Sequence, residues 1–170
     1  MASLIDELID VLDKEEKEYQ DLILLSQEKT PVIVKGDLEK LQRITEAEQI
    51  VIGKVNKYEK KRVEVVKDIA LVLGKDEEGL KVSDIIELLA SQPTEQQRLV
   101  AVYERLRDAL KRMNTVNELN KGLVNESLEF IGYNMNLLKS AYQEPETGNY
   151  TKQAYNTTPV SGTGVFDAKQ

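Results

Sequence analysis

The sequence contains no cysteine, no histidine and no tryptophan among its 170 residues. Without cysteine there is no disulfide and no thiol nucleophile, and without histidine there is no imidazole base. Zinc sites of the usual kinds need these same side chains. A di-metal carboxylate site in a helical bundle needs Glu-x-x-His pairs, so it is excluded too. We therefore expect no metal and no other cofactor.

Long hydrophobic runs are also missing, and glycine and proline are sparse, with nine and four residues. The apolar runs are a few residues long, whereas a membrane-spanning helix needs about 20. No signal peptide is visible. We expect a cytoplasmic protein without membrane insertion. Glycine and proline gather at 31–36, 74–93 and 145–164, which predicts connectors and a tail.

Charge is unevenly distributed along this acidic chain, whose formal net charge is −7. Residues 1–30 hold nine acids and three bases, whereas residues 31–142 hold equal numbers of each. An acidic protein with a neutral middle is a poor partner for nucleic acid, so we expect none.

The composition favours an all-α fold, because 41% of the residues are apolar, 31% are charged and only 5% are aromatic. Apolar residues recur at helical spacing from Leu4, after a possible capping box of Ser3 and Asp6. This first helix is expected to run to about Lys29 and to stop before Pro31, leaving 31–36 as a connector.

Capping residues delimit the later helices. Asp37 is a good N-cap for a second long helix, which contains Gly53 and ends at Gly74. Ser83 is expected to cap a short helix at 83–91 that Pro93 ends. Thr94 with Gln97 resembles another capping box, and the pattern is then helical to about Tyr142.

Three adjacent rows with seven-residue spacing form the stripe of this last helix. The first row is Leu99, Leu106, Met113, Asn120, Ser127, Asn134 and Ala141. The second row is Val102, Ala109, Val116, Leu123, Phe130 and Leu137. The third row is Tyr103, Leu110, Asn117, Val124, Ile131 and Leu138. The polar end of the first row suggests a polar edge on an apolar stripe.

The predicted architecture is an elongated antiparallel bundle of three long helices plus one short helix. The helical domain covers residues 1–142, and residues 143–170 form a disordered C-terminal tail, since their composition cannot bury enough apolar surface. Long helices of about 27, 37 and 49 residues would leave about 12 residues, Ile131 to Tyr142, beyond their neighbours. Such an apolar overhang suggests a partner-binding surface.

Other candidate sites are weaker. The acidic pairs Glu15/Glu16 and Glu77/Glu78 could serve acid–base catalysis, but a solvated surface is favoured. The basic stretch Lys54–Arg62 could contact phosphate, but a helix face balanced by the acidic first helix is favoured. For the asparagine-flanked stripe, partner binding and the setting of register or oligomeric state are equally compatible with the pattern.

The stretch "NELNKGLVNESLEFIGYNMNLLKSAY", followed by "ETGNY", resembles the C-terminal region of the FlgN-type flagellar export chaperones. The resemblance rests on Asn117, Asn120, a Leu-Val pair, "SLEF", "NLL" and a following Gly and Tyr. It covers about 30 residues. The overall plan of three long helices and a flexible tail is similar as well.

The resemblance implies a chaperone of bacterial flagellum biogenesis and no enzyme activity. Such proteins bind the C-terminal segments of hook-associated proteins and deliver them to the cytoplasmic domain of the export gate of the flagellar type III secretion apparatus. Carried over, the client-binding surface would be Asn117, Asn120, Leu123, Val124, Ser127, Phe130, Ile131, Asn134, Leu137 and Leu138. An aromatic residue of the tail would dock at the gate, with Tyr150 and Tyr155 as the preferred candidates and Phe166 after them. The alternative is a structural coiled-coil protein that self-associates through its C-terminal helix.

Overall fold

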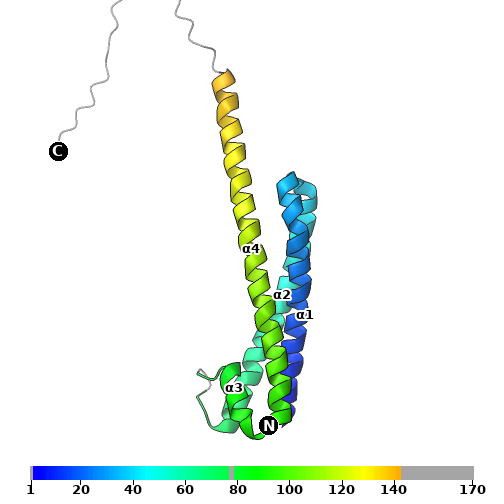
Figure 1. Ribbon diagram of the computed structural model, residues 1–170, viewed down its shortest axis with the longest axis vertical. Helices are drawn as coiled ribbons and strands as arrows, with labels where there is room; N and C mark the ends of the chain where they lie inside the picture. Colours follow the sequence, from blue (N-terminus) through cyan, green and yellow to red (C-terminus); the bar gives the residue numbers. More distant parts are fainter. Residues whose placement is uncertain (1, 77–78, 143–170) are drawn as a thin grey trace, which may run out of the picture. The chain divides into compact units, whose positions relative to one another are not determined.

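The computed structural model describes residues 2–76 and 79–142 and is helical, with no strand in this part of the chain (Figure 1). The all-α prediction is therefore confirmed. The elements in chain order are α1 (Ala2–Lys35), α2 (Leu38–Leu73), α3 (Val82–Leu88), a 3₁₀ turn η1 (Leu89–Ser91) and α4 (Pro93–Tyr142). The chain divides into two units, residues 1–132 and residues 133–170. The expected tail, 143–170, lies outside the described residues.

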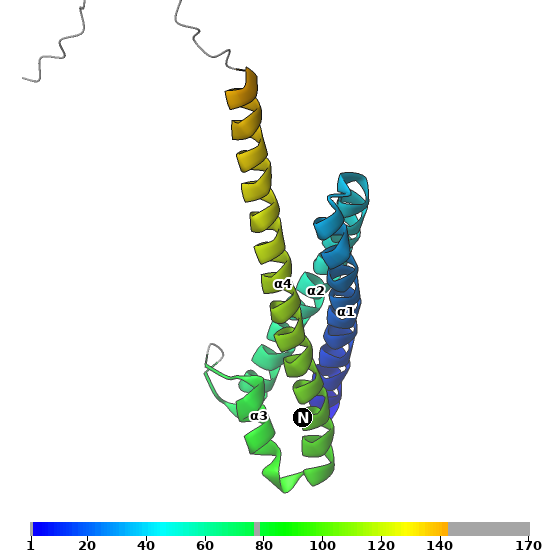
Figure 2. The ribbon, with the colours of Figure 1, turned by 45° about the horizontal axis from the view of Figure 1, so that its top comes forward.

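Within residues 1–132, α1 and α2 form an antiparallel pair and α4 runs back along them (Figures 1 and 2). The turn between α1 and α2 needs a left-handed residue, which Gly36 supplies with a φ of 68°. Ion pairs link α1 to α2 in antiparallel order, since Lys61 bonds Glu7 and Lys54 bonds Glu18. The basic stretch 54–62 is thus balanced by α1, as the sequence indicated.

Helix α1 continues through Pro31 to Lys35, so the prediction of an end near Lys29 is wrong. Proline removes one backbone hydrogen bond inside a helix. However, the turn that follows it buries Val32 and Ile33, which are 4% and 5% exposed. Burial of two branched side chains, at roughly 1.5–3 kcal/mol each, is large enough to offset that loss.

The predicted caps of α2 are confirmed. Asp37 has extended backbone angles, and its Oδ1 accepts a hydrogen bond from the Lys40 N–H at 3.0 Å. At the other end, Gly74 is left-handed with a φ of 63°, and the Lys75 N–H bonds the Ala70 carbonyl at 2.9 Å. Sequence therefore located both ends of this helix.

Three other helix starts differ from the sequence expectation by one or two residues. Helix α3 begins at Val82, so Ser83 lies within its first turn, and the Asp84 carboxylate accepts the Lys81 N–H at 2.9 Å. Helix α4 begins at Pro93, before Thr94. Proline is tolerated at this first position because the backbone N–H that it lacks would have no acceptor within the helix. Helix α1 begins at Ala2, before Ser3.

The core of residues 1–132 contains two apolar clusters. The first joins all four helices and includes Leu8, Ile69, Ile85 and Leu99. The second joins α1, α2 and α4 and is formed by Leu22, Ile23, Val51, Val55, Ala109 and Met113. Glu15 and Glu16 lie on α1 between the two clusters, and Tyr19 packs against both.

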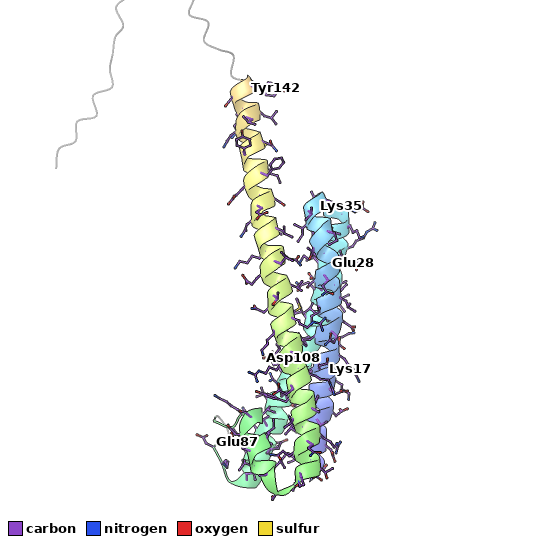
Figure 3. The ribbon with its side chains drawn as sticks, viewed as in Figure 1. Lys17, Glu28, Lys35, Glu87, Asp108 and Tyr142 are labelled. Carbon is purple, nitrogen blue, oxygen red and sulfur yellow. The ribbon has the colours of Figure 1, made fainter. Side chains whose placement is uncertain are left out.

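A ladder of polar contacts shows that α1 and α4 run parallel in a fixed register. Arginines of α4 at seven-residue spacing bond residues of α1 at the same spacing, in the pairs Arg98–Asp6, Arg105–Asp13 and Arg112–Gln20. Every pair is separated by 92 positions. Figure 3 accordingly shows Lys17 of α1 and Asp108 of α4 at the same level.

The middle rung of this ladder has an electrostatic signature. Lys17 and Arg105 lower the pKa of the Asp13 carboxyl, more than its partial burial raises it. These contacts are exposed, so each contributes at most about 1 kcal/mol. They serve mainly to fix which residues of the two helices lie opposite each other.

Candidate functional site

Asn120 is the last buried residue of α4. It continues the row of Leu99, Leu106 and Met113, whose exposed fractions are 0%, 3% and 6%, and is itself 6% exposed. The structure therefore differs from the sequence interpretation of this row as a polar edge. Up to Asn120, this row belongs to the face that α4 buries.

Hydrogen bonds to α1 explain why an asparagine occupies this buried position. The Asn120 Nδ2 donates to the Ser26 carbonyl at 2.8 Å, and the Thr30 hydroxyl donates to the Asn120 Oδ1 at 2.6 Å. Both ends of the amide thus have partners, so its burial carries no unsatisfied polar group. If α1 were shifted along α4, the Asn120 amide would lose its hydrogen-bond partners. The two bonds therefore fix the register of α1 against α4.

The same cluster extends to α2. The Ser26 hydroxyl, which is fully buried, donates to the Glu48 Oε1 at 2.8 Å. The Lys29 ammonium bonds the other Glu48 oxygen at 2.8 Å. We call Ser26, Lys29, Thr30, Glu48 and Asn120 the Asn120 cluster. It ties three helices together in the turns just before α1 ends.

After Asn120, residues 121–132 of α4 bury no side chain. Leu123 and Ser127 are half-buried, and the Ser127 hydroxyl donates to the Leu123 carbonyl of its own helix at 2.9 Å. Large apolar side chains are exposed in the same segment, namely Val124 at 36%, Leu128 at 61%, Phe130 at 66% and Ile131 at 56%. Apolar surface without a packing partner makes this segment a candidate interaction site.

The last turns of α4, residues 133–142, expose apolar side chains as well. Leu137 and Leu138 are 51% and 53% exposed, and Tyr133, Met135 and Tyr142 are also exposed. Asn134 is half-buried. These turns are helical, so their side chains follow the same spacing as the rows that the sequence defines.

Most of the residues expected to bind a client are thus accessible in this structure. Asn117, Val124, Phe130, Ile131, Leu137 and Leu138 are exposed, and Leu123, Ser127 and Asn134 are half-buried. Asn120 alone is buried. Its hydrogen bonds to Ser26 and Thr30 of α1 could not be expected from the seven-residue spacing in α4. Tyr150, Tyr155 and Phe166 lie outside the described residues.

Glu15 and Glu16, expected to be solvated, are 2% and 8% exposed. Burial raises the pKa of the Glu15 carboxyl, against the opposing effect of Arg62, whose Nε lies 3.2 Å from it. The expectation of a solvated pair is therefore wrong. It failed because the seven-residue spacing from Leu8 to Leu22 places Glu15 on the buried face. Glu77 and Glu78 lie outside the described residues.

Within residues 2–76 and 79–142, no group of three acidic side chains is arranged to hold a metal ion. In the same part of the chain, no helix has the length and hydrophobicity to cross a bilayer.

The helical architecture and the exposed apolar side chains after Asn120 define a helical binding protein. The family model described as "FlgN protein" matches residues 1–158. The chain therefore belongs to the FlgN family, and the resemblance drawn from its C-terminal region is confirmed. Membership assigns it the general role of a flagellar export chaperone.

A relative is the "Uncharacterized protein YvyG" of Bacillus subtilis (strain 168). It is 29% identical over 152 residues, and the match covers 89% of this chain and 89% of the relative. The similarity thus extends over the long helices and is not confined to the C-terminal motif. No solved structure matches the chain.

Proposed function

We propose that this protein is a cytoplasmic chaperone that binds hook-associated proteins before their secretion, through the C-terminal segments of those clients, and delivers them to the flagellar export gate. It acts by binding alone, without catalysis. Family membership supports the general role. The observation that carries the proposal is the run of nine exposed large apolar side chains between residues 121 and 142.

The client surface comprises Asn117 and the accessible residues of α4 beyond Asn120: Leu123, Val124, Ser127, Phe130, Ile131, Asn134, Leu137 and Leu138. An amphipathic client helix would lay its apolar side on this surface. The asparagines and Ser127 would pair with polar groups of the client. Asn120 is assigned a different role, because its amide already bonds α1.

Folding of the client on binding limits the affinity. A disordered segment that becomes helical loses conformational entropy, at a cost of about 2–5 kcal/mol or more. A moderate affinity of this kind suits a partner that must be released at the gate.

Replacing both Leu137 and Leu138 by Asp tests the proposal. Client binding, measured by calorimetric titration with a purified hook-associated protein, should be abolished, whereas the helical content and the melting temperature of the free protein should be unchanged. Leu71 and Val72 form a matched control, because they are another adjacent exposed pair, at 60% and 59%. Their replacement by Asp should leave client binding intact.

The same variants distinguish the alternative function. A structural coiled-coil protein would self-associate through α4, so the Leu137/Leu138 double substitution would dissociate a stable dimer. Analytical ultracentrifugation of the free wild-type protein and the variant detects this change. Loss of a dimer together with unchanged client binding would contradict the chaperone proposal.

The tail is proposed to contact the gate through Tyr150, Tyr155 or Phe166. Deleting residues 143–170 should leave client affinity unchanged and should reduce export of the client in cells. A truncated protein that has lost client affinity would refute this division of roles.

A further inference from the structure

A groove runs between α2 and α4 on the side where α3 packs. It consists of two adjoining hollows of about 490 and 450 Å³ that share Arg62 of α2 and Tyr103 of α4. The first hollow borders the start of α3 at Val82, and the second extends along α4 to Asn114. All its lining residues belong to residues 1–132.

The groove has an apolar floor and accessible apolar walls. Leu12 and Leu106, which line the second hollow, are buried at 0% and 3% exposure. Val63 of α2 lines the first hollow and is 48% exposed, and Leu110 of α4 lines the second and is 42% exposed. Side chains of this size on both walls offer contacts to an inserted apolar ridge.

The charge of the groove is opposite to that of the protein. Five basic residues and no acidic residue line it, although the chain has a net charge of −7. The basic residues are Arg62, Lys67, Lys81, Arg107 and Lys111.

Two of these five bases have acidic neighbours, whereas the three lysines have no ion pair within the described residues. Arg62 lies near Glu15 and Glu59, and Arg107 lies 3.7 Å from Glu104. Lys67 and Lys111 form no ion pair with any residue in the part of the chain that the structure describes. They stand on opposite walls, one on α2 and one on α4.

Helix α3 shows what kind of element fits between α2 and α4. It inserts Val82 and Ile85 into the first core cluster, together with Leu89 of η1. Figures 1 and 2 show it beside the end of α2 and the beginning of α4, where it stops after seven residues. Farther along, no helix of residues 1–132 occupies the equivalent place.

We propose that this groove binds an acidic amphipathic helix of another protein. Its apolar side would pack on Val63, Tyr103 and Leu110, and its flanking carboxylates would meet Lys67 and Lys111. Charge complementarity selects this occupant, because a basic helix would place like charges against both walls. The chain's own residues 143–170 are a poor candidate, with three acids, two bases and many Gly, Thr and Asn residues.

This groove adjoins the proposed client surface along α4, because Leu110 and Asn117 belong to the same seven-residue row, but none of the residues that line the groove is among the proposed client contacts. The two proposals therefore rest on different residues and can fail separately. The groove gives the chaperone a second docking site, placed on its packed body.

The test uses two designed helical peptides with identical leucines at i, i+3, i+4 and i+7, one flanked by Glu and the other by Lys. Fluorescence anisotropy measures their binding to the full chain, and amide chemical shifts locate the site. The acidic peptide should bind, with shift changes at Val63, Tyr103 and Leu110, and the basic peptide should bind at least about tenfold more weakly.

Charge reversal of Lys67 and Lys111, which stand on opposite walls, provides the second arm. Lys67→Glu with Lys111→Glu should weaken acidic-peptide binding about tenfold, at the scale expected for two accessible charge contacts. The matched control is Lys40→Glu with Lys57→Glu, which makes the same change of charge at two α2 lysines that line other hollows. This control should lower the affinity for the acidic peptide by less than about threefold. Circular dichroism should confirm that both double variants are folded.

Several results would overturn the proposal. They are absence of acidic-peptide binding at about 0.5 mM peptide, equal binding of the two peptides, shift changes outside the groove, and equal effects of the two double reversals. Analytical ultracentrifugation of the free protein tests one further outcome, the presence of a dimer. If Lys67→Glu with Lys111→Glu dissociates a dimer of the free protein, a second copy of this chain occupies the groove and the proposal is wrong.

Discussion

Replacing Asn120 by Ala is expected to destabilise the protein, whereas the same change at Asn117 is not. The two asparagines lie on the same helix less than one turn apart. Asn120 is 6% exposed and makes two side-chain hydrogen bonds to α1. Asn117 is exposed and makes no side-chain hydrogen bond within the described residues. The pair therefore separates the effect of the buried contacts from the effect of losing an asparagine.

The magnitude follows from two opposing terms. Each of the two hydrogen bonds contributes roughly 1 kcal/mol net, and their loss leaves polar groups of α1 less well satisfied. Alanine recovers about 0.6 kcal/mol of helix propensity. The net loss at position 120 is thus about 1–2 kcal/mol, which lowers the melting temperature by roughly 3–6 °C in a domain of this size. At position 117 only the propensity gain remains.

Thermal and urea melts followed by circular dichroism measure both variants under identical conditions. Asn120→Ala should shift both midpoints downward, and Asn117→Ala should leave them unchanged or raise them slightly. If both variants melted with the wild type, the hydrogen bonds to Ser26 and Thr30 would contribute nothing. The assignment of Asn120 to the bundle would then be refuted.

Three further substitutions test the fold. Burial raises the pKa of Glu15 above its usual value of 4.5, so the buried carboxylate lowers stability once the pH rises above 4.5. Glu15→Gln should therefore melt at a higher temperature than the wild type at pH 7. The difference in melting temperature should shrink as the pH is lowered toward 4.5. Pro31→Ala should restore a backbone hydrogen bond in α1 and raise the free energy of unfolding by about 1–3 kcal/mol, measured by urea titration. Gly74→Ala should lower it by about 1 kcal/mol, because Gly74 has a φ of 63° although a Cβ would meet no atom within 4 Å. The first expectation would be contradicted if Glu15→Gln and the wild type melted at the same temperature at pH 7. The other two would be contradicted if Pro31→Ala or Gly74→Ala left the free energy of unfolding unchanged.

Much of the helical framework was predictable because its signals are local. Asp37 and Gly74 mark the ends of α2 through interactions with residues three or four positions away. Apolar spacing alone identified the long helices. Pro31 misled the prediction because its local preference opposes the helix, whereas the burial of Val32 and Ile33 depends on packing that sequence spacing does not show.

The candidate site was predictable only in part. Exposure of Ile131, Leu137 and Leu138 agrees with the expectation of an uncovered apolar segment from Ile131 to Tyr142. The role of Asn120 was not predictable, because it depends on Ser26 and Thr30, some 90 positions earlier in the chain. The seven-residue spacing of Arg98, Arg105 and Arg112 could have revealed the register with α1, since Asp6, Asp13 and Gln20 repeat at the same interval.

The basic groove was missed for a related reason. Lys67 and Lys111 are far apart in the sequence and lie within a stretch of zero net charge. Their common location follows only from the packing of α4 along α2. Net charge computed along the chain therefore concealed a local field of opposite sign.

The central claim is that a hook-associated protein binds the part of α4 that follows Asn120. Hydrogen–deuterium exchange of the free protein and of its complex with that client tests this claim most directly. The account predicts slower exchange in peptides covering residues 121–142, with little change in α1 and α2. Unchanged exchange in residues 121–142 of a complex whose formation is verified would contradict it.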